Sequence, residues 1–305
     1  MDWGQLPQYL VLGVQLGAVY ALIALGYTMV YGVLRLINFA HGDVFMIGAY
    51  LAYYTSMVWF DRHAINPYLM LGMMLLMAMI GCAVLGVVIE RLAYRPLRSA
   101  PRISVLITAV GVSLFIEYAG RLVVQTSPQP SIVQEVNVLA KPMNIWGINV
   151  EQSQIAVLAV VLVLMGLLFF YVTRTSMGRA MRAVSHDFNT ASLMGVNVDR
   201  VVVVTFIIGS ALAGAGGMLQ ATSFGSPLNT FYGLLPGVKA FVAAVLGGIG
   251  NIPGAVVGGL IMGVAETAVV WAGYAGYKDA VAFVILIVIL LFRPGGLFGS
   301  TAEKV

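Results

Sequence analysis

Two glutamates lie inside apolar stretches of this sequence, where a carboxyl group needs either a partner or water. They are Glu117 and Glu266, and an ionisable side chain in an apolar environment marks either a polar pathway or a buried pair. Arg121 follows Glu117 by one helical turn, so an ion pair along the helix is the alternative to a pathway role there. Glu266 has no cation within one turn. For Glu266 the alternative is a role in packing between helices.

Three polar residues, Asn38, His41 and Asp43, lie in the segment LINFAHGDVFMIGAY between two apolar runs. Polar residues with a glycine at such a junction predict a hinge or a helix break. A proton relay or a metal site would use the same side chains, but two candidate ligands are too few for a metal cage. We therefore expect no metal site and treat the three residues as candidates for lining a polar pathway.

Glycines and prolines interrupt the apolar segment LLPGVKAFVAAVLGGIGNIPGAVVGG. Its Gly247, Gly248 and Gly250 predict a broken or re-entrant helix, because backbone groups freed at such a break must be buried in protein or line a cavity. These glycines are the third group of pathway candidates. A tight turn between two helices is the alternative.

A polar stretch covers residues 174–200, RTSMGRAMRAVSHDFNTASLMGVNVDR, and cannot cross an apolar layer. Ala180, Val184, Phe188 and Ala191 recur at helical spacing, and Gly195 offers a stop signal. The pattern predicts one amphipathic helix outside the membrane. It would rest in the lipid interface or contact another protein, and the small apolar face of alanine and valine favours a protein groove.

The elements that position these residues are membrane-spanning helices. Of the 305 residues 60% are hydrophobic and 9% charged, against about 25% charged in soluble domains, which excludes a water-soluble globule. Apolar runs of spanning length occur at 9–33, 41–60, 68–90, 103–125, 155–173, 201–222 and 254–272, with shorter runs at 236–249 and 280–293. We predict an all-α integral membrane protein, a polytopic bundle of eight or nine transmembrane helices in a single domain covering residues 1–305.

Arginines cluster in two segments, residues 91–102 and 174–200. Basic residues accumulate in cytoplasmic loops, so both segments are predicted to be cytoplasmic and the loop at 126–154 to lie outside. If both short runs cross, the N-terminus is outside and the C-terminus inside. The formal charge of +4 is explained by this topology, and we expect no nucleic-acid partner. Small residues four apart, such as Gly13 with Gly17 and Gly259 with Gly263, predict close helix packing.

Catalytic motifs are absent from the sequence. No phosphate-binding loop of the form G-x-x-x-x-G-K-[ST] occurs, and no nucleophile has a neighbouring base. Cys82 is the single cysteine, which rules out an intrachain disulfide and a thiolate cluster. We expect no enzyme and no cofactor in this chain.

Four long motifs resemble the LivH-type permease of high-affinity branched-chain amino acid ABC transporters. The similarity runs almost end to end, and the 126–154 loop carries least of it. The motifs are LGAVYALIALGYTMVYGVLRLINFAHGDVFMIGAY, ERLAYRPLRSA, MGRAMRAVSHDFNTASLMGVNVDRVVVVTFIIGSALAG and KAFVAAVLGGIGNIPGAVVGGLIMGVAE.

The resemblance implies a type II-like ABC importer permease in the bacterial inner membrane that translocates leucine, isoleucine and valine. Its implied partners are a second, LivM-like permease, two LivG- and LivF-like ATPases that bind ATP and Mg, and a periplasmic amino-acid-binding protein. It implies alternating access driven by the ATPases and a coupling helix that sits in an ATPase groove. The coupling candidates are Gly178, Arg179, Arg182, Val184, Asp187, Phe188 and Gly195.

Three alternatives stay open. A permease for urea, short amides or other amino acids would share these motifs. A stand-alone secondary transporter or channel would work without an ATPase, but would carry more charged membrane residues for ion coupling. An intramembrane enzyme would depend on His41 with Asp43 or on Glu266, and no further catalytic group supports it.

Overall fold

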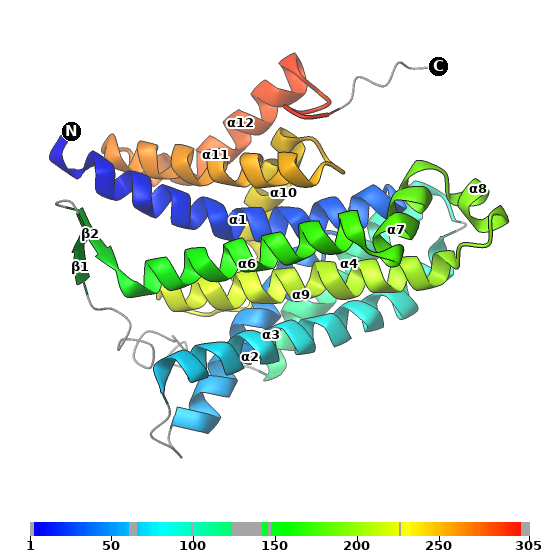
Figure 1. Cartoon of the computed structure of the whole chain (residues 1–305), viewed down its shortest axis with the longest axis horizontal. Helices are drawn as coiled ribbons and strands as arrows, with labels where there is room; N and C mark the ends of the chain where they lie inside the picture. Colours follow the sequence, from blue (N-terminus) through cyan, green and yellow to red (C-terminus); the bar gives the residue numbers. More distant parts are fainter. Residues whose placement is uncertain are drawn as a thin grey trace.

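The computed structural model describes residues 3–60, 66–98, 100–123, 142–145, 148–225 and 227–299. These residues form a helical bundle with one small β-hairpin (Figure 1). The prediction of an all-α membrane protein is confirmed. The elements are α1 (Leu6–Leu34), α2 (His41–Phe60), α3 (Pro67–Ile89), α4 (Arg102–Val123), β1 (Pro142–Ile145), β2 (Ile148–Glu151), α6 (Gln152–Arg174), α7 (Ser176–His186), α8 (Phe188–Leu193), α9 (Val198–Phe224), α10 (Leu234–Gly247), α11 (Ile252–Trp271) and α12 (Lys278–Phe292).

Seven helical stretches in the described part of the chain are long and apolar enough to cross a membrane. They include the stretch 275–292, so the expected short run at 280–293 is long enough to span. α10 has 14 residues, a length of about 21 Å, which is less than the hydrocarbon core of about 30 Å. α2, which we expected to cross, is not among the seven. The eighth and ninth crossings depend on these two helices and stay predictions.

Glycines let α1 and α11 lie against each other without side chains between them. A Cβ placed on Gly17 would come within 2.8 Å of the Leu260 Cα, and one on Gly259 within 2.6 Å of the Ala21 Cα. Gly13 faces Val264 in the same antiparallel register. The predicted close packing of small residues is therefore confirmed for this helix pair.

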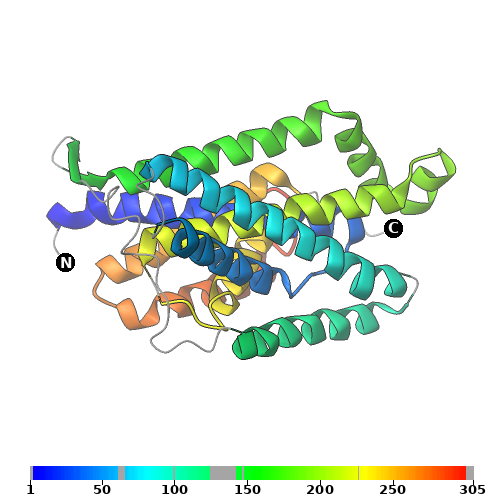
Figure 2. The same cartoon turned by 90° about the horizontal axis from the view of Figure 1, so that it is seen from below.

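α1 and α9 are the central helices of the bundle. In the most apolar 18-residue stretch of each helix, 67% of α1 and 72% of α9 is buried. Figure 2 shows α6 and α4 on opposite sides of the bundle with the central helices between them. The helices whose apolar surfaces are mostly exposed form the outside of the bundle. In α12, for example, only 11% of the apolar stretch is buried.

The two ends of the bundle differ in charge. Figure 1 places the N-terminus and the β-hairpin at one end and α7 with α8 at the other. Both arginine-rich segments meet at the α7 end, since Arg95 pairs with Asp199. The positive-inside rule predicts that this is the cytoplasmic end, so it is called the cytoplasmic end below and the opposite end the outer end. Residues 124–141, most of the predicted outer loop, lie outside the described residues.

Candidate functional site

The cytoplasmic segment forms two helices, α7 and α8, so the prediction of one continuous helix is wrong. Asp187 causes the break: its carboxylate accepts hydrogen bonds from the backbone N–H groups of Asn189 at 2.9 Å and Thr190 at 3.1 Å and thereby caps a new helix. Hydrogen bonds from Thr190 and Asn189 lower the pKa of this exposed carboxyl. Gly195 has a φ of +84° and ends the segment as predicted.

The apolar side of α7 packs on the chain itself. Gly178 lies directly against the carbonyl groups of Tyr171 and Val172 at the end of α6, and the Arg182 guanidinium donates to the Val172 carbonyl. Val184 is 2% exposed. The prediction that Val184 contributes to an exposed docking face is therefore wrong, because an 11-residue helix needs its apolar face to hold it on the bundle.

The exposed side of the segment carries three large apolar residues, of which the periodicity singled out only Phe188. Leu193 is 87% and Met194 80% exposed, and Phe188 is 39% exposed. Arg179 also lies on the exposed side. In Figure 1 the short helix α8 lies at the far end of the bundle, beyond the long helices. Large apolar side chains on such a projection are typical of a protein contact, and their signal in the sequence was a Leu-Met pair inside a polar stretch.

Arg35, the residue after α1, holds the end of α7. It adopts a left-handed conformation with φ 54°, and its guanidinium donates to the carbonyl groups of Ser185 and His186 at 3.4 and 3.3 Å. A cation at a helix C-terminus is electrostatically favourable. A cavity of about 430 Å³ lies between this contact and α8 and includes Phe188 in its lining.

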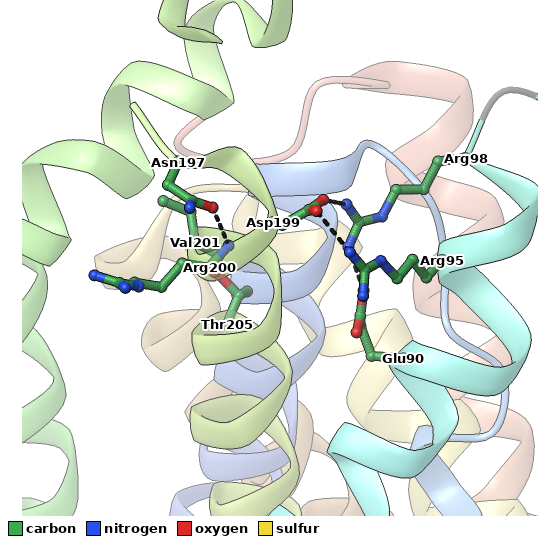
Figure 3. Close-up of polar contacts among 8 residues, drawn as sticks. All are labelled: Glu90, Arg95, Arg98, Asn197, Asp199, Arg200, Val201 and Thr205. Atoms are coloured by element: carbon green, nitrogen blue, oxygen red, sulfur yellow. Dashed lines mark hydrogen bonds and ion pairs between the residues drawn. The ribbon is translucent and has the colours of Figure 1, made fainter. Parts of the chain in front are cut away.

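A cluster of ion pairs joins the end of α3 to the start of α9 (Figure 3). Arg95 and Arg98 both bind the Asp199 carboxylate, Arg95 at 2.9 Å, and Arg98 also binds Glu90, whose side chain is fully buried. Asp199 lies in the first turn of α9, where a negative charge is favourable. Arg200 points away from the cluster in Figure 3. The cluster joins the two basic segments. The surface that the cluster forms together with α7 and α8 is called the cytoplasmic platform below.

Asn38, His41 and Asp43 lie at the junction of α1 and α2. Asp43 lines a cavity, whereas Asn38 and His41 make buried contacts. Asn38 is buried and accepts a hydrogen bond from the Tyr94 hydroxyl at 2.9 Å. His41 begins α2, and its buried ring lies 4.5 Å from the ring of Tyr27, centroid to centroid. The predicted break is present between α1 and α2. The buried contacts of Asn38 and His41 hold the chain in place at this break.

Asp43 and Glu117 line a second cavity of about 470 Å³ between α2, α4, α10 and α12. The Ser113 hydroxyl donates to Asp43 at 2.5 Å, and Glu117 is close enough to interact with Asp43. Among the described ion pairs none joins Glu117 to Arg121, which is exposed. The helical ion pair considered for Glu117 is therefore not formed, and its carboxyl faces the cavity.

Glu266 on α11 pairs with a cation from another helix. Its carboxylate binds the Lys239 ammonium at 2.7 Å and accepts a hydrogen bond from the Tyr20 hydroxyl at 2.9 Å. Lys239 also pairs with Asp279 at 2.6 Å. The group lines a cavity of about 640 Å³ at the outer end. Sequence reasoning missed Lys239 because it lies 27 residues from Glu266 on another helix.

The glycines of the broken-helix segment form a turn at the cytoplasmic end. Gly248 and Gly250 have φ values of +101° and +96°, and Gly247 lies directly against the backbone of Gly254. None of the three cavities described above includes them in its lining. The structure therefore contains a tight turn, which was the alternative to a broken or re-entrant helix. The short apolar run predicted at 236–249 corresponds to α10.

The helices and their hydropathy make the chain a multi-pass membrane protein, and comparison with known proteins gives the family. The chain belongs to the family described as "Branched-chain amino acid transport system / permease component", whose model matches residues 9–290. The LivH-type resemblance is thereby confirmed, as is the location, the bacterial inner membrane.

Similar proteins cover nearly the whole chain. The permease BraD of a high-affinity branched-chain amino acid transport system in Pseudomonas aeruginosa is 41% identical over 98% of this chain and 97% of its own length. LivH of the corresponding Escherichia coli system is 40% identical over 96% of both chains. A probable LivH of Methanocaldococcus jannaschii is 28% identical over 93% of this chain and 89% of its own. The similarity to BraD and to the Escherichia coli LivH spans nearly the whole length of both chains in each comparison.

Proposed function

We propose that this chain is the permease subunit of an ATP-driven importer that moves leucine, isoleucine and valine across the bacterial inner membrane. The observation that carries the proposal is the end-to-end similarity to BraD and LivH, whose names give branched-chain amino acids as cargo. Identity near 40% over the whole length covers both the outer and the cytoplasmic ends of the bundle. A second, LivM-like permease supplies the other half of the path.

Energy enters at the cytoplasmic platform. Two LivG- and LivF-like ATPases bind ATP and Mg, and each docks on a permease through a segment such as α7 with α8. The exposed Leu193 and Met194 fit an apolar groove in such a partner. Because Arg35 joins α7 to α1 and Arg95 joins α3 to α9, a movement of the platform acts directly on both central helices.

Substrate enters from the outer end. A periplasmic binding protein selects the amino acid and delivers it, so the permease needs only a passage that accepts a zwitterion with an aliphatic side chain. The outer cavity of about 640 Å³ is within the usual range for small-molecule sites, about 300–1,000 Å³. Closure of the ATPases then switches the permease pair from one open side to the other.

The test is uptake by the reassembled importer. The chain is co-expressed with its genomic neighbours and placed in vesicles, and ATP-dependent uptake of labelled leucine is measured with the binding protein present or omitted. We expect uptake only with all components and competition by unlabelled isoleucine and valine. Competition by urea or short amides instead would assign another cargo, and uptake by this chain alone without ATP would make it a secondary transporter.

A further inference from the structure

The outer cavity contains a balanced set of charges. Lys239 and Lys278 supply two cations and Glu266 and Asp279 two carboxylates, all in the lining of the same cavity. Lys239 and Glu266 are each 5% exposed, and their helices, α10 and α11, are held by this contact. Buried charges are retained only where they are paired, so the Lys239 ammonium between its two carboxylates is a built feature of the cavity.

The two carboxylates hold Lys239 differently. Glu266 is buried and also accepts a hydrogen bond from Tyr20, whereas the Asp279 side chain is 41% exposed. The Lys239 ammonium also lies 5.9 Å from the centre of the Tyr20 ring, within the range of a cation–π contact. Asp279 is the partner that can leave Lys239, because water at the cavity opening can solvate it.

Two further residues in the lining of the same cavity carry a buried polar atom without a hydrogen-bond partner among the described residues. The atoms are the Tyr232 hydroxyl and the Gln220 side-chain carbonyl, both fully shielded. Tyr232 is 8% exposed as a whole. A buried polar atom without a hydrogen bond is costly and needs an explanation. A ligand with an acceptor for the Tyr232 hydroxyl and a donor for the Gln220 carbonyl would supply the missing partners.

The remaining lining matches an aliphatic side chain. Leu12 and Leu16 of α1, Leu235 of α10 and Val270 of α11 lie around the charged group. α10 begins at Leu234, and its first turn lines the cavity through Leu235 and Pro236, so the positive end of this short helix favours a carboxylate there. The cavity therefore offers one site for an anion, one for a cation and an apolar wall.

From these contacts we propose that the outer cavity binds the transported amino acid as a zwitterion. The substrate carboxylate replaces Asp279 beside Lys239, and the released Asp279 carboxylate takes the substrate ammonium. Tyr232 donates to the carboxylate, and the Gln220 carbonyl accepts from the ammonium. No net charge enters the membrane, because each substrate charge meets an opposite one. This deepens the proposed function and rests on it.

The first experiment removes only the unpartnered groups. Tyr232→Phe and Gln220→Leu are made in the complete importer, with Tyr274→Phe as the matched control, since Tyr274 is an exposed residue of the outer end that does not line the cavity. We expect uptake by each cavity variant to fall about tenfold, the loss of one hydrogen bond to a charged group, while the thermal midpoint of the complex stays level or rises. The control keeps full uptake.

The ion pair is tested by replacing both partners together. Lys239→Met with Glu266→Gln leaves no uncompensated buried charge, and such replacements are often neutral for stability. We expect normal assembly with loss of uptake by at least about tenfold. Normal uptake by this double variant, by Tyr232→Phe and by Gln220→Leu would overturn the site and leave the proposed function intact.

Binding measured without transport separates the two proposals. The purified complex without binding protein is mixed with leucine, isoamylamine or 4-methylpentanoate, and contact is detected by saturation-transfer NMR. Leucine should give a signal that the Lys239→Met, Glu266→Gln variant loses, and the analogues with one charge should give little. Equal signals from all three would contradict a zwitterion site, whereas a leucine signal in a complex that transports another solute would contradict only the proposed cargo.

Discussion

At the scale of single residues, the sequence identified the ionisable groups in apolar runs but not their partners, which lie on other helices. Glu266 was recognised as an ionisable group in an apolar run, but its partner Lys239 lies on another helix. Glu117 had a candidate partner one turn away in Arg121, yet it faces Asp43 across α2 and α4. Sequence spacing fixes which residues share a helix face, whereas contacts between helices depend on how the helices pack.

The residue-scale prediction concerns the docking surface. Leu193→Glu with Met194→Glu places two charges on side chains that are 87% and 80% exposed, so the permease itself should fold normally. We expect ATPase co-purification to fall at least about tenfold, since apolar anchors dominate such contacts. The measurement is the ATPase to permease ratio after affinity purification.

A matched control distinguishes docking from folding. Val184→Asp puts a charge on a side chain that is 2% exposed and should lower the yield of the permease itself. If the Leu193 and Met194 variant retains its ATPases at the normal ratio, α8 is not the docking surface.

At the scale of elements, helices with strong apolar periodicity or composition were predictable, and the exceptions have local causes. The long apolar runs of 9–33 and 201–222 correspond to α1 and α9, and the glycine and proline signals correspond to the short α10. The single amphipathic helix expected at 174–200 fails at Asp187, whose side chain caps a new helix. The apolar face of that segment was correctly located, but the sequence could not say whether its own chain or a partner covers it.

The element-scale prediction tests the glycine contact between α1 and α11. A Cβ on Gly263 would collide with the backbone of Gly17, so Gly263→Ala should destabilise the bundle by about 1–3 kcal/mol. The same substitution at Gly72 in α3 is the control, because nothing lies within 4 Å of its Cβ position. Gly72→Ala should be neutral or stabilising, since alanine favours helix by about 0.8–1 kcal/mol.

The readout for this pair is the thermal midpoint of the purified permease in detergent. A lower midpoint for Gly263→Ala alone confirms that the backbones of α1 and α11 must touch. Equal midpoints for the two variants would show that this helix pair adjusts freely, and the close packing would then contribute little to stability.

At the scale of the whole molecule, α9 connects the two functional ends. Its first turn carries Asp199 in the cytoplasmic ion cluster, and its other end carries Gln220 in the outer cavity. α9 also has the largest buried share of any candidate span, 72%. Because packed interiors transmit displacement and are not compressible, a movement of the platform that shifts the start of α9 also shifts the wall of the outer cavity.

The last prediction tests this connection through Asp199. Asp199→Asn removes the charge that holds Arg95 and Arg98 but leaves the Arg98 contact with Glu90. Because Asp199 is 54% exposed, the loss of stability should be small, about 0–1 kcal/mol for such a pair, and the importer should still assemble. We expect fewer leucine molecules moved per ATP hydrolysed, with Asp199→Glu restoring most of the ratio. An unchanged ratio in Asp199→Asn would mean that the platform drives the path through α1 and Arg35, and that the cluster only fixes the end of α3.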